Sequence, residues 1–322
     1  MRHHKQEARF FAVRPRGPDQ PPPFRVLLGW RWMAAGVATG ATVLVAMLAL
    51  PRRRARILRV LAAGGAVGSF AALANGLHNA LFPALKQIDL ALKGLPHPFA
   101  GLRVMHISDM HVGAPLTRRA VRRALALARA AQPDLILLTG DFVSYTRHLD
   151  LLPTLLGTLQ APLGMYASLG NHDQWTQPAT LARILHAAGI RLLVNQHRVV
   201  TRGGARLIIA GVDDVWSGKP DLEAALLDAP DDVPVILLAH SPDYADVALH
   251  APVALQLAGH SHGGHIRLPL LGPLMLPRHG IRYDRGLHRL GRMTLYVSHG
   301  VGGWPLRIGC RSEVTLFTLR PA

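Results

Sequence analysis

Cysteine is almost absent from this 322-residue sequence, which contains only Cys310. A chain with one cysteine forms no internal disulfide, and it cannot build a metal site from four thiolates. Aromatic residues are also scarce, at 6%, and only four of the 36 basic residues are lysine. We therefore expect Cys310 to be a small buried residue and the fold to depend on an apolar core or on ligands other than sulfur.

Acidic residues are also few, with 19 against 36 basic residues and a net charge of +17. Residues 1–100 contain 14 basic and 3 acidic residues, whereas residues 101–322 contain 22 and 16. A nucleic-acid-binding domain would present a basic stripe interleaved with aromatic side chains. Because the excess charge lies mainly in the first third and aromatic residues are rare, no nucleic-acid partner is predicted. Basic charge beside apolar segments is more typical of membrane proteins.

Composition divides the chain into four parts. Residues 1–25 are polar and rich in proline, which predicts a disordered tail. Residues 26–80 contain two charge-free apolar segments of 18 residues each, Met33–Leu50 and Val60–Leu77. A helix needs about 20 apolar residues to cross a bilayer, so both are short transmembrane or signal-like helices. We assign residues 81–100 to a linker and residues 101–322 to a large domain.

The short connection between the two apolar segments is rich in arginine, with five in residues 51–59. Basic loops stay on the cytoplasmic side, so a helical hairpin would place the large domain on the outer, periplasmic face. The seven basic residues before the first segment are evidence against this orientation. Two alternatives remain: a cleaved signal segment, which leads to the same face, and a second segment buried as an Ala-rich helix in a cytoplasmic protein.

The large domain alternates short apolar runs with helical patterns, which predicts an α/β layered sheet. The predicted strands are 102–108, 134–139, 165–169, 206–211, 233–239, 255–258, 293–298 and 314–319. The predicted helices are 117–131, 149–159, 178–188 and 221–227. In such sheets ligands bind at the carboxyl ends of the strands.

Potential metal ligands cluster at these strand ends. Six fragments are found: Asp109-Met110-His111, Gly140-Asp141, Gly170-Asn171-His172-Asp173, His240, Gly259-His260 and His262. Two Asp, one Asn and four His give mixed oxygen and nitrogen ligation, which suits Mn, Fe, Zn or Co better than Mg or Ca. The Asp141 carboxylate can bridge two cations because it has two oxygens. Two ions about 3.5–4 Å apart form a clamp for phosphoryl chemistry and lower the pKa of a bridging water.

The ordered pattern D-x-H, G-D, G-N-H-[DE], H and G-H-x-H resembles the calcineurin-like metallophosphoesterase superfamily. The resemblance implies a four-layer αββα sandwich over residues 102 to about 320 and a dinuclear centre of Mn, Fe or Zn. It further implies that the first ion is bound by Asp109, His111, Asp141 and His262. It implies that the second is bound by Asp141, Asn171, His240 and His260.

The same resemblance implies metal-dependent hydrolysis of a phosphoester by a hydroxide that bridges the ions. His172 would be the catalytic histidine that protonates the leaving group, and Asp173 would orient its ring. Diesters are favoured over monoesters, and a phospholipid or other lipid-linked phosphate is a candidate substrate. The alternative is a catalytically inactive scaffold of the same fold at the membrane.

A closer resemblance is to a bacterial subgroup with N-terminal membrane or signal segments, which predicts a location at the bacterial inner membrane. It rests on the runs Leu238–Asp243, Gly259–Gly264 and Arg267–Pro273. His265 and His299 depart from the residues expected in that subgroup. We therefore expect substrate contacts around these two histidines and the apolar run 268–277.

Overall fold

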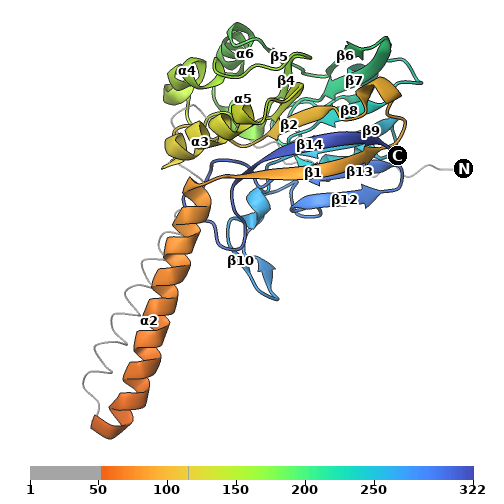
Figure 1. Cartoon of the computed structure of the whole chain (residues 1–322). Helices are drawn as coiled ribbons and strands as arrows, with labels where there is room; N and C mark the ends of the chain where they lie inside the picture. Colours follow the sequence, from red (N-terminus) through yellow and green to blue (C-terminus); the bar gives the residue numbers. More distant parts are fainter. Residues whose placement is uncertain (1–51, 115) are drawn as a thin grey trace, which may run out of the picture.

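The computed structural model describes residues 52–114 and 116–322, with the side chains of residues 52–61 left out. Two six-stranded sheets form the centre of the molecule (Figure 1). The first contains, in spatial order, β1 (Ala84–Leu92), β14 (Glu313–Pro321), β2 (Arg103–Ile107), β3 (Leu135–Thr139), β4 (Met165–Ser168) and β5 (Ile190–Leu192). The second contains β12 (Gly286–Leu290), β13 (Met293–Val297), β9 (Val253–Ala258), β8 (Val235–Leu238), β7 (Ala205–Gly211) and β6 (Gln196–Arg202).

Both sheets are mainly parallel in the middle and antiparallel nearer an edge. Strands β2 to β5 run parallel to one another, and β14 pairs antiparallel with β2. In the second sheet β13, β9, β8 and β7 are parallel, and β12 and β6 are antiparallel edge strands. A short third ladder pairs β10 (Arg267–Leu268) with β11 (Gly272–Pro273).

Side chains alternate between the two faces of each strand, so each sheet packs on both sides. In β7, Leu207 and Ile209 pack with residues of the first sheet, whereas Ile208 and Ala210 face the helices beyond the second sheet. The helices of the second sheet are α7 (Leu222–Leu226) and α8 (Ala245–Ala248). The inter-sheet layer and the two outer layers are therefore separate apolar clusters, and the predicted αββα order is confirmed.

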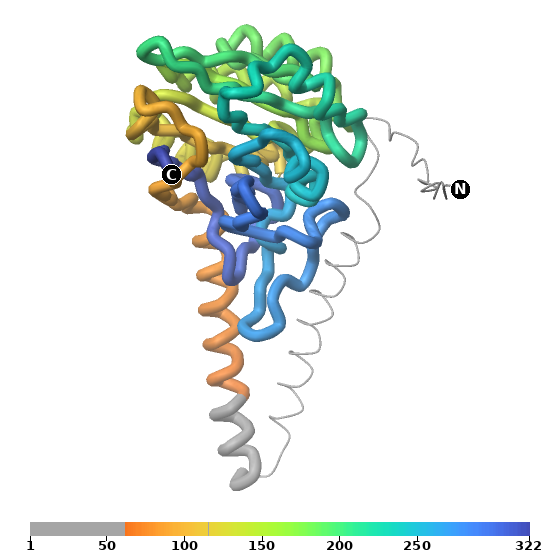
Figure 2. Tube along the Cα trace, turned by 90° about the vertical axis from the view of Figure 1, so that its right-hand side faces the viewer, coloured from red at the N-terminus to blue at the C-terminus, as the bar shows by residue number. Residues whose placement is uncertain are grey.

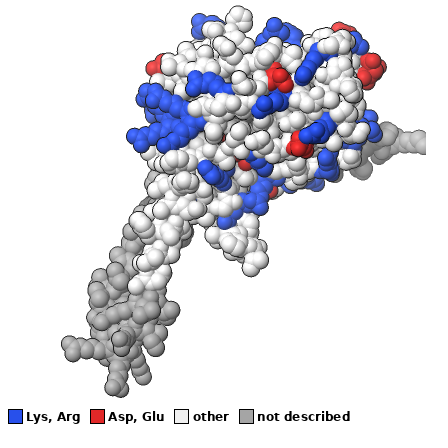
Figure 3. All heavy atoms as spheres, in the orientation of Figure 1, with Lys and Arg blue, Asp and Glu red and all other residues white. Residues whose placement is uncertain are grey.

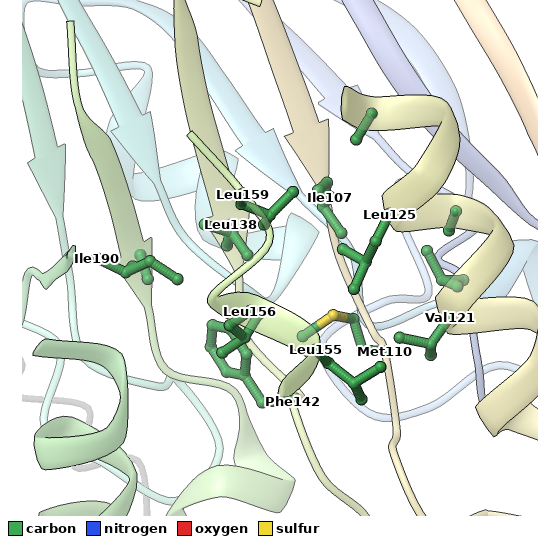
Figure 4. Close-up of a cluster of buried hydrophobic side chains, with 14 of the residues drawn as sticks. Ile107, Met110, Val121, Leu125, Leu138, Phe142, Leu155, Leu156, Leu159 and Ile190 are labelled. Atoms are coloured by element: carbon green, nitrogen blue, oxygen red, sulfur yellow. The ribbon is translucent and has the colours of Figure 1, made fainter. Parts of the chain in front are cut away.

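The outer layer of the first sheet is the largest apolar cluster and is shown in Figure 4. It is covered by α3 (Thr117–Ala130), α4 (Leu152–Leu156) and α6 (Pro178–Ala187). Val121 and Leu125 of α3 pack toward Ile107 and Met110, which lie at the end of β2 (Figure 4). Burial of these side chains fixes the carboxyl end of β2, where the predicted ligands begin.

The predicted linker is wrong, because Ala84–Leu92 is strand β1, paired in parallel with β14 along its whole length. Leu90 and Leu92 of this strand are buried between the sheets. Gln87 and Asp89 lie on the other face of the strand and are exposed, so the segment resembles a polar linker in the sequence. The predicted helix 149–159 is also shorter, since a 3-10 turn over Thr146–Leu151 precedes α4.

The segment before β1 is a single 30-residue helix, α2 (Arg52–Leu81). It extends away from the sheets, and only its carboxyl end is seated on the domain (Figure 1). Across the part of the chain that the structure describes, no helix combines the length and the apolar character needed to cross a membrane. The prediction that Val60–Leu77 spans a bilayer therefore finds no support, and Met33–Leu50 lies outside the described residues.

Candidate metal centre

All seven predicted ligands lie at the carboxyl ends of parallel strands, where the two sheets meet. Asp109 and His111 follow β2, Asp141 follows β3, and Asn171 opens the short helix α5 (Asn171–Trp175) after β4. From the second sheet, His240 follows β8, and His260 and His262 follow β9. The structure thus collects residues from five strands and two sheets at one end of the sandwich, as predicted from the sequence.

Asp141 lies at the centre of this group. One of its carboxylate oxygens, Oδ2, is 3.3 Å from Nε2 of His111 and 3.3 Å from Nε2 of His240. On one side Asp109, His111 and His262 form a group that could hold a metal ion, and on the other side Asp141, His240 and His260 form a second. His111 links them, since its Nε2 is also 3.1 Å from Nε2 of His262. Asp141 is therefore placed to serve two neighbouring cations.

The imidazoles are oriented by partners on their outer nitrogens. His240 donates from Nδ1 to the carbonyl oxygen of Thr139 at 2.6 Å, and His260 donates from Nε2 to that of Arg278 at 2.7 Å. These bonds fix each tautomer and leave the other nitrogen with a lone pair facing the cluster, as metal-binding histidines require. Asn171 Oδ1 is one of several buried polar atoms of the described residues that have no hydrogen-bond partner. A buried polar atom without a partner is costly, so the Asn171 oxygen fits a metal ligand.

The backbone around the ligands is strained. Asp109, His111, Asp141, His260 and His262 all have positive φ, between 44° and 67°. Non-glycine residues rarely adopt this conformation, which costs about 1–3 kcal/mol and clusters at functional sites. Five of the seven ligands share it, which indicates that the turns are shaped to aim side chains at a common point.

Glycine at two positions lets the β3 and β4 turns meet. A Cβ atom on Gly140 would lie 2.3 Å from the backbone nitrogen of Gly170, and one on Gly170 would lie 2.3 Å from Oδ1 of Asp141. The glycines in the G-D and G-N-H-D fragments are therefore required for close approach of the two ligand turns.

The buried carboxylates of the site favour a positive charge close to them. Burial alone would lower the pKa of His240, but the nearby carboxylates of Asp141, Asp109 and Asp214 raise this pKa well above its usual range. His260, by contrast, has its pKa lowered to about 3 by burial, so its ring is neutral. A divalent cation would supply the positive charge that these carboxylates favour, and its binding would need the neutral form of His240.

His172 lies at the margin of the cluster. Its ring stands edge-on to the ring of His111, with centroids 4.7 Å apart, and unlike the seven ligands it is only partly buried. Its backbone N–H donates to Oδ1 of Asp141 at 2.9 Å. The ring is therefore next to the predicted ions, at a position that a substrate can reach.

Asp173 is predicted to orient the ring of His172, but the structure shows its carboxylate bonded to the backbone. Its carboxylate accepts backbone N–H groups from Gly170, Asp141 and Phe142 at 2.7–2.9 Å. The ring of His172 is instead stabilised by a hydrogen bond to the backbone of Ser144. Asp173 thus holds the two ligand turns together, which its position at the start of a helix favours.

Arg307 is a site residue that no motif in the sequence indicates, because it is 45 positions from the histidine it contacts. It is fully buried. Its guanidinium donates from Nη2 to the carbonyl of Gly302 at 2.5 Å and lies 3.3 Å from Nδ1 of His262. It also donates from Nη1 to the carbonyl of His299. Arg307 therefore ties the loop after β13 to the outer nitrogen of a predicted ligand.

The two histidines that depart from the expected pattern differ in position. His265 stacks on the ring of His262, with centroids 4.5 Å apart. His299 instead hydrogen-bonds the Arg311 carbonyl and lies 3.5 Å from the Glu313 carboxylate. Of the two, only His265 contacts a predicted ligand, and His299 is held by residues at the start of β14.

Comparison with known proteins agrees with this geometry. Residues 102–264, which contain all seven predicted ligands, match the family model of the calcineurin-like phosphoesterases. The chain is 35% identical over 234 residues to the uncharacterized metallophosphoesterase YkuE of Bacillus subtilis, covering 70% of this chain and 82% of the relative. It is 33% identical over 230 residues to phosphodiesterase YaeI of Escherichia coli, covering 68% and 83%.

A third relative is the transmembrane protein with metallophosphoesterase domain of Danio rerio, 34% identical over 266 residues. That alignment covers 77% of this chain and 60% of the relative. The fold and the site define a metallophosphoesterase. The chain belongs to the calcineurin-like phosphoesterase family, and it is a hydrolase that acts on phosphoesters.

Proposed function

We propose that this protein hydrolyses a phosphodiester at a dinuclear centre of two divalent ions, Mn, Fe or Zn. The central observation is that Asp141 lies between two ligand groups and is within 3.3 Å of an imidazole from each. Asp109, His111, His262 and Asp141 would hold the first ion, and Asp141, Asn171, His240 and His260 the second. When bound, such a pair neutralises phosphoryl charge and lowers the pKa of water.

The protein's own groups would position the reaction. The bonds from His240 to Thr139 and from His260 to Arg278 keep both rings in one tautomer, so little rearrangement accompanies binding. His172 would hold a proton at the leaving-group oxygen. Burial lowers the pKa of its ring to about 4, and an anionic phosphoryl group beside it would favour the protonated form.

A diester is favoured as substrate because one of the similar proteins is a phosphodiesterase by name. A lipid-linked phosphate is the candidate class within the diesters. This choice is motivated by the apolar residues exposed close to the site.

The test uses the full chain, stripped by a chelator and reloaded separately with Mn²⁺, Fe²⁺ or Zn²⁺. We expect at least one metal to restore hydrolysis of bis(p-nitrophenyl) phosphate, with a higher kcat/KM than for p-nitrophenyl phosphate. A lipid extract assayed for phosphate-containing products tests the lipid class. Failure of every metal to restore turnover would favour the inactive-scaffold alternative.

We also propose that the protein is associated with the bacterial inner membrane, with the catalytic domain on the periplasmic face. The support is the arginine-rich stretch between the two apolar segments. Protease added to spheroplasts that express the chain should digest the domain. Protection of the domain until the cells are lysed would contradict this orientation.

A further inference from the structure

Residues 268–281, called here the apolar loop, place several large apolar side chains in solvent. Leu270 is 107% exposed and Leu271 76% exposed, and Leu274, Met275 and Ile281 are also exposed. Soluble proteins rarely display so many large apolar side chains on one segment, and where they do the surface is a binding site. The loop begins only six residues after His262, so this surface adjoins the metal centre.

Helix α2 provides a second exposed apolar surface. Every residue from 63 to 75 is exposed, including Val67, Phe70 and Leu73. Figures 1 and 2 both show α2 and the apolar loop leaving the domain on the same side and in the same direction. In Figure 3 the projecting tip of the loop and the part of α2 after residue 61 carry no Lys, Arg, Asp or Glu, and basic side chains gather on the domain above them.

The carboxyl end of α2 is fixed to the domain, so the two apolar surfaces keep their relative position. The backbone N–H of Arg307 donates to the carbonyl of Gly76 at 3.0 Å, and the hydroxyl of Ser312 donates to that of Asn79 at 2.8 Å. The base of the loop is held by Asp243, which accepts the N–H groups of Ile281 and Arg282. A partner that binds the apolar loop would therefore also contact the exposed side of α2.

We propose that the apolar loop and the exposed side of α2 together dock on a bilayer containing anionic lipids. The loop is a projecting tip, and a bilayer accepts projecting apolar side chains without a matching concave surface. Arg278, Arg282 and Arg285 are exposed at the base of the loop, where they would face lipid headgroups. The arginine-rich start of α2 follows directly after the charge-free segment Met33–Leu50, whose composition also suits a membrane.

Docking would bring the metal centre to the lipid surface. The carbonyl of Arg278, at the base of the apolar loop, accepts the hydrogen bond that orients the His260 ring. Loop and site are thus joined by a direct contact. A lipid-linked phosphodiester as substrate rests on the proposed function, whereas docking itself does not.

The test places an environment-sensitive fluorophore on the full chain through Leu271→Cys, since buried Cys310 is shielded from labelling. The matched control is Leu227→Cys, an exposed leucine after α7, which packs at the opposite edge of the second sheet. After reconstitution into phosphatidylcholine–phosphatidylglycerol vesicles, we expect the label at 271 to shift to shorter wavelength and to be quenched by doxyl-labelled lipids. The label at 227 should show neither effect.

A label at 271 that stays unshifted and unquenched in vesicle-bound protein would overturn the proposal. A shift that appears without vesicles and grows with protein concentration would also overturn it, because a second copy of the chain would then cover the loop. Neither readout requires turnover. If the enzyme proves inactive, the fluorescence result still tests docking. If the enzyme is active but the label at 271 is not quenched, docking is refuted and the proposed function stands.

Discussion

Two neighbouring segments of this chain have opposite surroundings. Residues 259–264 carry two predicted ligands and are buried, with His260 4% and His262 8% exposed. The apolar loop follows after three residues and contains the most exposed leucine described. Polar residues are therefore inside and apolar residues outside, the reverse of the usual arrangement. Such an inversion is stable when cations or ligand contacts compensate for the buried polar atoms and lipid covers the apolar side chains.

The largest effect should come from Asp141, the buried ligand that both ligand groups share. Asp141→Asn keeps the size of the side chain but removes a charge that serves both ligand groups. We expect kcat/KM to fall by about 1,000-fold, because metal stabilisation of the transition state amounts to several kcal/mol and about 1.4 kcal/mol corresponds to tenfold. Asp213→Asn is the matched control, since Asp213 accepts hydrogen bonds from a nearby turn and belongs to neither group. Similar losses in both variants would argue against a special role for Asp141.

The next effect should come from His172, which lies between the buried ligands and the solvent. His172→Ala should reduce kcat by about 100-fold for a diester with an alkyl leaving group, because proton transfer contributes 10²–10⁴-fold. The loss should be much smaller for a p-nitrophenyl ester, whose leaving group needs no proton. Bound metal, measured by mass spectrometry, should not change. An equal loss on both substrates would exclude proton donation by His172.

Arg307 should have an intermediate effect, since it contacts His262 without being a ligand. Arg307→Met should weaken metal binding by about tenfold, because the buried carbonyls of Gly302 and His299 beside His262 lose their donor, at a cost of about 1–3 kcal/mol. Metal titration of the apo-protein measures this loss directly. Arg307→Lys, which keeps the charge but not the forked geometry, should recover only part of it. Unchanged metal affinity in both variants would limit Arg307 to a role in packing.

The smallest effect on chemistry should come from the exposed segment. Replacing Leu270, Leu271 and Met275 together by Ser should leave kcat/KM for a soluble diester unchanged within about twofold, because exposed side chains contribute little to stability. On a diester embedded in vesicles the same variant should lose about tenfold or more, since burying one large apolar side chain is worth about 1.5–3 kcal/mol. A parallel loss on both substrates would show that the loop acts on the site itself.

Sequence patterns predicted most of the central fold and the end of the sandwich at which the seven predicted ligands lie together. All eight predicted strands form, because each is a short run that is almost fully buried on both faces. Among the strands that were missed, β6 and β12 lie at the edges of the second sheet, where many residues face solvent and no apolar run forms. Strand β1 was missed because Gln87 and Asp89 on its exposed face interrupt the apolar pattern.

Contacts between segments that are distant in the chain could not be predicted from the sequence. The three backbone N–H groups that bond Asp173 belong to Gly170, three residues before it, and to Asp141 and Phe142, 32 and 31 residues before it. The contact between Arg307 and His262 arises only when the loop after β13 folds over the site. The apolar composition of residues 268–277 was visible in the sequence, but its exposure and its alignment with α2 depend on the fold.

The most direct test of the account is the position of the metal ions. Crystals grown with Mn²⁺ and measured at the manganese absorption edge should show two anomalous peaks per chain. One peak should lie among Asp109, His111 and His262, the other among Asn171, His240 and His260, and the carboxylate of Asp141 should touch both. A single peak, or a second peak that does not contact Asp141, would contradict a dinuclear centre built on this shared ligand.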